Sequence, residues 1–115
     1  MPYFVVIQEQ GPAWDATKEF PWQQKGWNEH SKFMRTLVNE RFIILGGPLK
    51  KWPPIRDLLI VDATDEASVR SRLAEEPYMS SGILKIVELY PWEIHYSLNV
   101  SVISIPLESS QGGSK

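Results

Sequence analysis

The sequence contains no cysteine, which excludes a disulfide framework and any chemistry that depends on a thiolate. No apolar run approaches the roughly 20 residues that a membrane-spanning helix requires. The amino-terminal segment MPYFVVIQEQ lacks a basic region followed by a long apolar stretch, so it does not resemble a secretory signal. Together these absences favour a protein of the reducing cytoplasm that has no membrane partner.

The sequence also lacks a cluster of basic residues. Among 115 residues, 12 are basic and 14 are acidic, and the basic residues are scattered along the chain. Nucleic-acid binders show a basic face or stripe, so nucleic acid is not an expected partner. His30 and His95 lie far apart without any cysteine, which is no metal signature. Gly46-Gly47-Pro48 leads into a proline-rich turn and not into a helix, so it is no phosphate loop, and we expect neither a metal nor a cofactor.

Hydrophobic residues make up 43 % of the chain, enough for one globular domain with a substantial core. β-branched and aromatic runs predict strands at residues 3–7, 41–45, 57–62 and 83–93. Helices are expected at residues 27–40 and 65–75, with Pro77 ending the second, and Gly46-Gly47-Pro48 is expected to stop the second strand. In the fourth strand, simple alternation places Leu84, Ile86 and Tyr90 on one face and Ile83, Val87 and Leu89 on the other.

This order of elements predicts an α+β fold, a ferredoxin-like βαββαβ antiparallel sheet with both helices on one face. The strands are almost continuously apolar, so the second sheet face should also be covered, and a face-to-face homodimer would cover it. Alternation at residues 96–105 predicts an extra strand, which could pair within the subunit or across the dimer. We therefore divide the chain into a domain at residues 1–94, an extension at 95–106 and a disordered tail at 107–115.

The first predicted helix carries the residue that most suggests chemistry. At about 100° per residue, His30 falls near the middle of an apolar stripe that includes Trp27, Met34 and Leu37. A buried imidazole must find hydrogen-bond partners or lose solvation energy. Two interpretations follow: a core histidine bonded to a backbone carbonyl, or a neutral imidazole that accepts protons in a pocket.

Other residues leave similar alternatives open. The connector at residues 11–25 is long for a small domain and carries Trp14, Phe20 and Trp22. It could close over a hydrophobic ligand or simply pack over the end of the helix. Arg56 and Asp57, at the start of the third strand, are expected to make a surface or dimer contact.

Several segments, in this order and spacing, resemble the YCII-related (YciI-like) family of the dimeric α+β-barrel proteins. They are His30 with Phe33-Met34, residues 42–48, Glu76-Pro77-Tyr78 with Gly82, and Pro91-Trp92. The resemblance covers residues 3–92 and implies a ferredoxin-like fold that dimerises as an α+β barrel, which agrees with the prediction from element order.

The resemblance also implies an enzyme-like pocket beside His30. In the family a histidine–aspartate pair has been proposed as catalytic, one relative eliminates chloride, and the related muconolactone isomerases shift protons. Glu76 stands where the family usually has aspartate before proline and an aromatic residue, and it is the candidate partner of His30. Trp14, Trp22, Trp27, Met34 and Tyr78 are the candidate substrate-binding residues.

These observations predict a cofactor-independent enzyme of lyase, isomerase or cyclase type. Its His30 would transfer a proton on a small hydrophobic or aromatic acid. The alternative is a non-catalytic ligand-binding or accessory dimer in which His30 is a core residue.

Overall fold

The computed structural model describes residues 2–51 and 54–98, and its elements follow the predicted order. The strands are β1 (Tyr3–Gln10), β2 (Ile43–Pro48), β3 (Arg56–Asp62) and β4 (Leu84–Trp92). The helices are the 3₁₀ helix η1 (Pro21–Gln23), the α-helices α1 (Trp27–Asn39) and α2 (Glu66–Ala74), and the single turn α3 (Pro77–Ser80).

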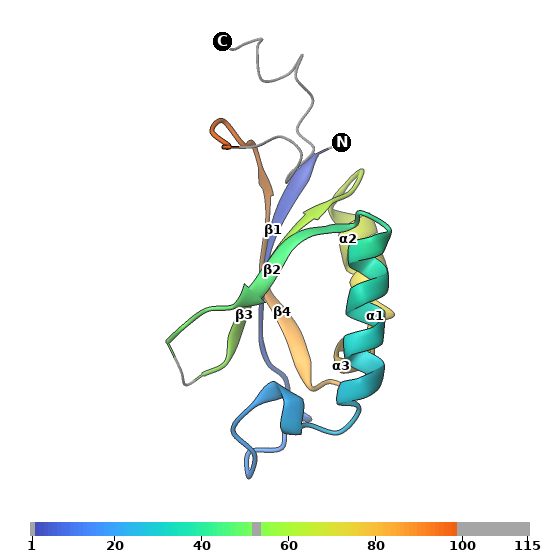
Figure 1. The fold of residues 1–115 in the computed structure, drawn as a ribbon, viewed down its shortest axis with the longest axis vertical. Coiled ribbons are helices and arrows are strands. Elements are labelled where there is room, and N and C mark those ends of the chain that lie inside the picture. The colour runs from blue at the N-terminus through green and yellow to red at the C-terminus, as the bar shows by residue number, and fades with distance from the viewer. Residues whose placement is uncertain (1, 52–53, 99–115) are drawn as a thin grey trace.

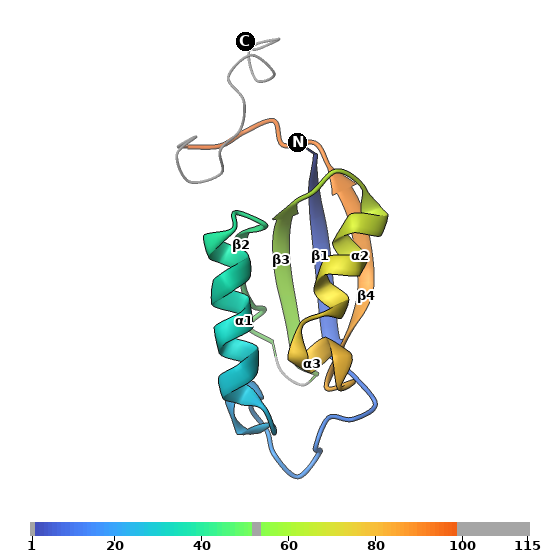
Figure 2. The ribbon, with the colours of Figure 1, turned by 90° about the vertical axis from the view of Figure 1, so that its right-hand side faces the viewer.

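The four strands form one antiparallel sheet in the order β2-β3-β1-β4. Helices α1 and α2 lie side by side on the same face of this sheet (Figure 1, Figure 2). Helix α1 joins β1 to β2 and α2 joins β3 to β4, so two βαβ units interleave. This is the ferredoxin-like α+β fold that the order of elements predicted.

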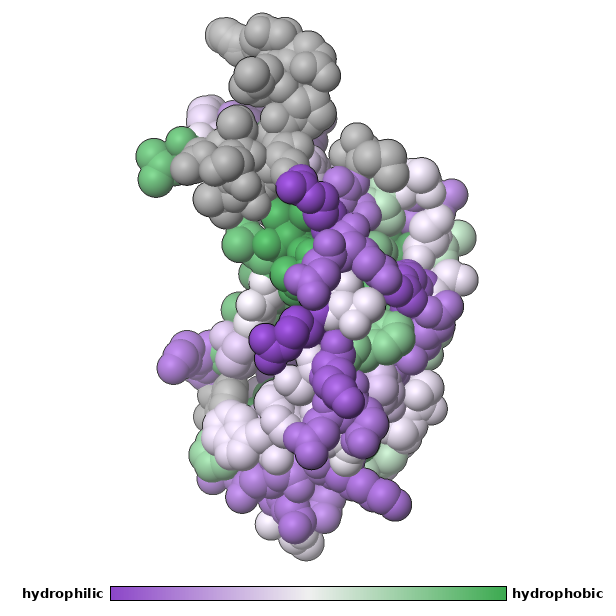
Figure 3. Space-filling model, turned by 45° about the vertical axis from the view of Figure 1, so that its right-hand side comes forward, coloured by the Kyte–Doolittle hydropathy of each residue, from purple (hydrophilic) through white to green (hydrophobic). Residues whose placement is uncertain are grey.

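The main core lies between the sheet and the two helices. In the register of β1 with β3, Phe4 pairs with Val61 and Val6 with Leu59, and all four side chains belong to this core. The other buried members are Leu37, Ile43, Ala63, Val69 and Leu73. On the outside of the helices, Figure 3 shows mainly hydrophilic residues, as expected for helices with one apolar stripe.

The predicted limits of the second strand were wrong at both ends. Arg41 has a positive φ of 65° and lies in a turn, so β2 begins only at Ile43. Gly46-Gly47-Pro48 does not stop the strand, which continues to Pro48. Strand β2 lies at the edge of the sheet, where a proline is tolerated because one side of the strand needs no ladder partner.

The predicted alternation in the fourth strand was also wrong. A β-bulge leaves Val87 without a partner on β1, between paired residues Ile86 and Glu88. The extra residue reverses the phase of the strand, so Ile86 and Leu89 both pack against the core.

Pro77 follows the end of α2, as predicted, but it also begins a further helical turn that the sequence did not predict. Proline suits the first position of a helix because that position needs no N–H donor. Glu76 caps the turn, since its Oε2 accepts a hydrogen bond of 2.9 Å from the backbone N–H of Tyr78.

The predicted strand at residues 96–105 and the predicted tail at 107–115 fall largely outside the described residues. Residues 93–98, which are described, form neither helix nor strand. The proposed boundaries near residues 95 and 107 therefore stay predictions.

The sheet face opposite the helices is largely apolar, as the hydrophobic strands predicted. Val5 of β1 pairs with Tyr90 of β4, and Ile60 of β3 pairs with Leu45 of β2. Tyr90 is 52 % exposed, Leu45 45 % and Trp92 42 %, which is high for such large apolar side chains.

Arg56 lies on this same face, where its guanidinium is 3.0 Å from Glu9 and 3.3 Å from Glu88. The side chain of Asp57, one residue along β3, points to the other face of the sheet.

Candidate active site

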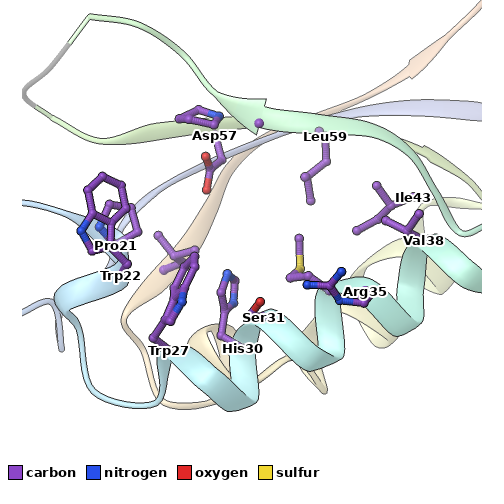
Figure 4. Close-up of a pocket in the computed structure, with 15 residues that line it drawn as sticks. Pro21, Trp22, Trp27, His30, Ser31, Arg35, Val38, Ile43, Asp57 and Leu59 are labelled. Carbon is purple, nitrogen blue, oxygen red and sulfur yellow. The ribbon is translucent and has the colours of Figure 1, made fainter.

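A cavity of about 540 Å³ lies between α1 and the β2–β3 edge of the sheet (Figure 4). Residues of α1 form one wall, β2 and β3 form the opposite wall, and η1 closes one end. The lining is mainly apolar and aromatic. Four lining residues carry ionisable or hydroxyl side chains: His30, Ser31, Arg35 and Asp57.

Glycine at position 46 keeps the β2 wall close to β3. A Cβ atom at this position would lie 2.7 Å from the Cδ2 atom of Leu59, so a larger residue would displace that core side chain. The two glycines and the compact proline ring of this segment thus form a wall that leaves the cavity open.

His30 and Glu76 form a buried pair at the α1 wall. The Nδ1 atom of His30 is 2.5 Å from Oε2 of Glu76, although the two residues are 46 positions apart in the sequence. His30 is 9 % exposed and Glu76 is fully buried. The structure therefore brings together the two residues that the sequence analysis named as a candidate base and its partner.

Glu76 is held in place by two contacts to one of its oxygens. Its Oε2 accepts from the Tyr78 backbone N–H and faces Nδ1 of His30, whereas its buried Oε1 has no partner in the described part of the chain. Glu76 thus contacts the imidazole of its candidate partner His30 and also binds a nearby backbone amide.

An ionised Glu76 selects one tautomer of His30. A carboxylate accepts only if Nδ1 carries the hydrogen, so the lone pair of the neutral ring is on Nε2. Nε2 has no hydrogen-bond partner within the described residues, and the ring lines the cavity, unlike Glu76 behind it. The arrangement can accept a proton from a molecule in the cavity.

Tyr78 supports the histidine from behind instead of lining the cavity. Its ring stacks on His30 with centroids 4.1 Å apart and planes 10° apart. Its hydroxyl donates to the backbone oxygens of Pro21, at 2.7 Å, and Gln24, at 3.2 Å. Tyr78 therefore joins the histidine to the connector that closes one end of the cavity.

Replacing Tyr78 by Phe should remove both of these hydrogen bonds while keeping the stacked ring. We expect a loss of about 1–2 kcal/mol in the free energy of unfolding, because two carbonyl oxygens lose their donor. Urea unfolding measures the loss, and limited proteolysis should show faster cleavage within residues 11–25. An unchanged unfolding curve would show that the hydroxyl does not hold the connector.

The same substitution should change the dependence of stability on high pH. Burial, and secondarily the charge of Glu76, raises the pKa of Tyr78 from 10.0 to about 12. The stabilisation by this phenol is complete below pH 10 and is lost as the pH rises through 12, because the unfolded chain ionises first. The advantage of the wild type over Tyr78→Phe should therefore shrink over this range.

The tryptophans named from the sequence are divided between two places. Trp22, Trp27 and Met34 line the cavity, with Trp27 5.3 Å from His30 between ring centroids. Trp14 lies elsewhere, packed against the cluster of Tyr78, Ile83 and Leu84 and bordering a second cavity of about 280 Å³. The connector thus contributes to the candidate site through its later residues.

Two lining residues with charged side chains were not predicted as site residues. Asp57 points from β3 into the cavity, instead of making the surface or dimer contact expected of it (Figure 4). Its alternation with core residues Leu59 and Val61 was the available signal, since alternate strand residues share a face. Arg35 is exposed on α1, and the length of its side chain brings the guanidinium to the cavity.

Within residues 2–51 and 54–98, no three histidine, aspartate or glutamate side chains are grouped closely enough to hold a metal ion. None of the helices in this part of the chain is long and apolar enough to cross a membrane.

No family model matches the sequence, and a search of curated proteins also finds no match. Among solved structures, the chain is similar to the 5-chloro-2-hydroxyhydroquinone dehydrochlorinase of Burkholderia phenoliruptrix AC1100, solved in complex with 2,5-dihydroxybenzoquinone. The TM-score is 0.56 at 16 % sequence identity, over 79 % of this chain and 93 % of that chain. This likeness shows the fold. Membership of the YCII-related family stays a prediction.

Proposed function

We propose that this protein is a cofactor-independent enzyme that moves a proton on a small hydrophobic or aromatic acid, as a lyase, isomerase or cyclase. His30 is the base, and Glu76 holds it in the tautomer that presents Nε2. The similar dehydrochlorinase structure is compatible with small-molecule chemistry on this fold. The roles of His30 and Glu76 are argued from this chain alone.

One observation carries the proposal: an imidazole held by a buried carboxylate, with its other nitrogen unpartnered at an apolar cavity. A histidine that served packing alone would gain nothing from an open cavity beside it. General-base catalysis needs a positioned group of this kind within reach of the substrate.

Arg35 is the residue that we propose binds the acid group of the substrate. This residue lines the same cavity, and its guanidinium makes no hydrogen bond or ion pair within the described residues. The hydroxyl of Ser31 lies one turn before it on α1 and also lines the cavity. A free guanidinium beside a hydroxyl suits a carboxylate, while Trp27 and Met34 suit an aromatic ring.

The proposal is tested by following proton exchange directly. Aromatic and polyketide acids are first screened by thermal shift, since a ligand at 100 times its Kd stabilises by about 2.7 kcal/mol. Phenylpyruvate, whose methylene hydrogens are acidic, is then incubated with the protein in D₂O and followed by NMR. We expect deuterium to enter in proportion to protein concentration. Ligands that bind without any exchange above the buffer rate would favour a non-catalytic ligand-binding or accessory dimer.

As part of the same proposal, two copies of the chain pair through the open sheet face. The exposed Leu45, Tyr90 and Trp92 form the apolar part of that face, and the Arg56–Glu9–Glu88 group forms its polar part. Side chains of this size exposed on one sheet face commonly mark an interface.

The replacement of Leu45 by Lys should convert the dimer into a monomer. A lysine in an apolar interface loses solvation without gaining a partner. Light scattering after size-exclusion chromatography measures the mass, and Ala67→Lys on the exposed surface of α2 is the control that should stay dimeric. A wild-type protein that is monomeric at micromolar concentration would contradict the proposed dimer.

A further inference from the structure

Asp57 is an unpaired carboxyl group in the wall opposite His30. Figure 4 shows its oxygens directed from β3 toward α1, across the cavity from His30 and Trp27. Its carboxyl makes no hydrogen bond or ion pair within the described residues. A carboxyl group in an apolar wall weakens the fold unless it has a partner or a use.

The charges around Asp57 do not compensate it fully. His30 in the opposite wall and Glu76 behind it, at the start of α3, are the titratable groups that act on Asp57, and they act in opposite directions. Its neighbour Arg56 is turned to the other sheet face, where it pairs with Glu9 and Glu88. Burial raises the pKa of Asp57 above its usual value, His30 partly opposes the rise, and Glu76 adds to it.

Asp57 and Arg35 also lie toward different ends of the cavity. Arg35 is near Val38 and Ile43, whereas Asp57 lies on the side of Trp22 (Figure 4). The strand register agrees. Asp57 pairs with Pro48 at the last residue of β2, whereas Ile43, the first residue of β2, pairs with Val61 at the other end of β3. A carboxylate held by Arg35 would therefore leave the remote end of the substrate facing Asp57.

We infer that Asp57 is a second proton-transfer residue, the acid that faces a carbonyl oxygen while His30 acts on the neighbouring carbon. The inference rests on the proposed function and narrows its substrate to an enolisable carbonyl compound, a ketone or quinone that also carries an acid group. Two groups on opposite walls can act on one substrate in a concerted manner.

The step balances within the substrate and these two residues. His30 Nε2 removes a proton from the carbon beside the carbonyl, and the C–H electron pair forms a carbon–carbon double bond. The carbonyl π electrons move to oxygen, which takes the proton of the Asp57 O–H group. The product is an enol, with His30 protonated and Asp57 ionised. In a substrate whose enol is conjugated with a second carbon–carbon double bond, return of the proton to the far carbon of that system, with Asp57 recovering its own proton from the enol oxygen, completes an isomerisation.

The first test compares Asp57→Asn with the wild type in deuterium exchange of phenylpyruvate, an acid, and β-tetralone, a neutral ketone. Asparagine keeps the shape but cannot give up a proton, so exchange should fall about 100-fold, chiefly in kcat. The wild-type kcat/KM should decline as rising pH ionises Asp57, and the variant should lack this decline. Asp62→Asn, on the same strand but the opposite sheet face, is the matched control and should match the wild type.

A second readout does not depend on turnover. A raised pKa means that the contribution of Asp57 to stability is complete below the unfolded value of about 4 and is lost as pH rises through the folded value. Asp57→Asn should therefore raise the melting temperature at pH 7, and the gain should vanish near pH 4.

The outcomes separate this inference from the proposed function. Unchanged exchange and an unchanged pH profile in Asp57→Asn, with His30→Gln inactive, would overturn the role of Asp57 and leave His30 as the base. Loss of stability in Asp57→Asn at pH 7 would also overturn it, because the carboxyl would then have a structural partner. Absence of exchange in the wild type with both probes would overturn the inference together with the proposed function.

Discussion

Replacement of His30 by Gln is expected to reduce proton exchange on the substrate by about 10²–10⁴-fold, the usual contribution of a positioned general base. The glutamine amide can still donate to Oε2 of Glu76, so the buried carboxylate keeps a partner and the protein should fold. Exchange of phenylpyruvate hydrogens in D₂O, followed by NMR, measures the effect, with ligand affinity determined separately by thermal shift. We expect the loss to appear in kcat and not in binding.

His95→Gln is the matched control for this substitution. The side chain of His95 is 61 % exposed and contacts Glu93 outside the cavity, so its loss should leave exchange unchanged. Equal rates for the wild type and both variants would remove His30 from the mechanism and favour its role as a core residue.

Replacement of Glu76 by Ala should cause the largest loss of stability of any substitution at the site, about 3–5 kcal/mol, because each buried group left without a partner costs about 1–3 kcal/mol. The substitution leaves Nδ1 of His30 and the N–H of Tyr78 without their shared acceptor, and it removes the cap of α3. Urea denaturation followed by circular dichroism measures the free energy of unfolding. Glu75→Ala is the control, because that residue contacts Arg72 on the surface and should cost no more than about 1 kcal/mol.

Glu76→Gln separates the charge of this residue from its shape. The amide oxygen can still accept from both N–H groups, so the loss should be only about 1–2 kcal/mol. The loss of exchange activity, expressed as a free energy, should exceed the loss in the free energy of unfolding. The reason is that a neutral amide stabilises the protonated imidazole less than a carboxylate does. If Glu76→Ala proves as stable as Glu75→Ala, the buried pair contributes nothing to the fold.

The separate sequence signals that marked His30 and Glu76 were local. His30 was apparent because the helical period places it within an apolar stripe. An imidazole is unusual there, because it must find hydrogen-bond partners or lose solvation energy. Glu76 was apparent because it precedes proline and an aromatic residue, in the pattern that the family resemblance supplied. Neither pattern states that the two side chains meet, since 46 residues separate them. The packing of α3 beside α1 brings about that contact.

Strand phase shows where periodicity fails. The alternation of Asp57 with Leu59 was readable from the sequence, yet a charge at the start of a strand usually faces solvent, and this one faces a cavity. In β4, one bulged residue reversed the predicted faces, because the twist and pairing of neighbouring strands decide where a bulge forms. The length of β2 likewise depended on its edge position and not on its Gly-Gly-Pro sequence.

The sequence by itself determined the order of elements, the ferredoxin-like fold and the position of His30 on the inner face of the first helix. These follow from patterns with a period of two or 3.6 residues, which act over short distances along the chain. Only the tertiary structure decided which carboxylate reaches His30, that Tyr78 lies behind it, and that Asp57 and Arg35 border the same cavity. Such contacts join residues far apart in sequence, and the packing of helices on the sheet sets their distances.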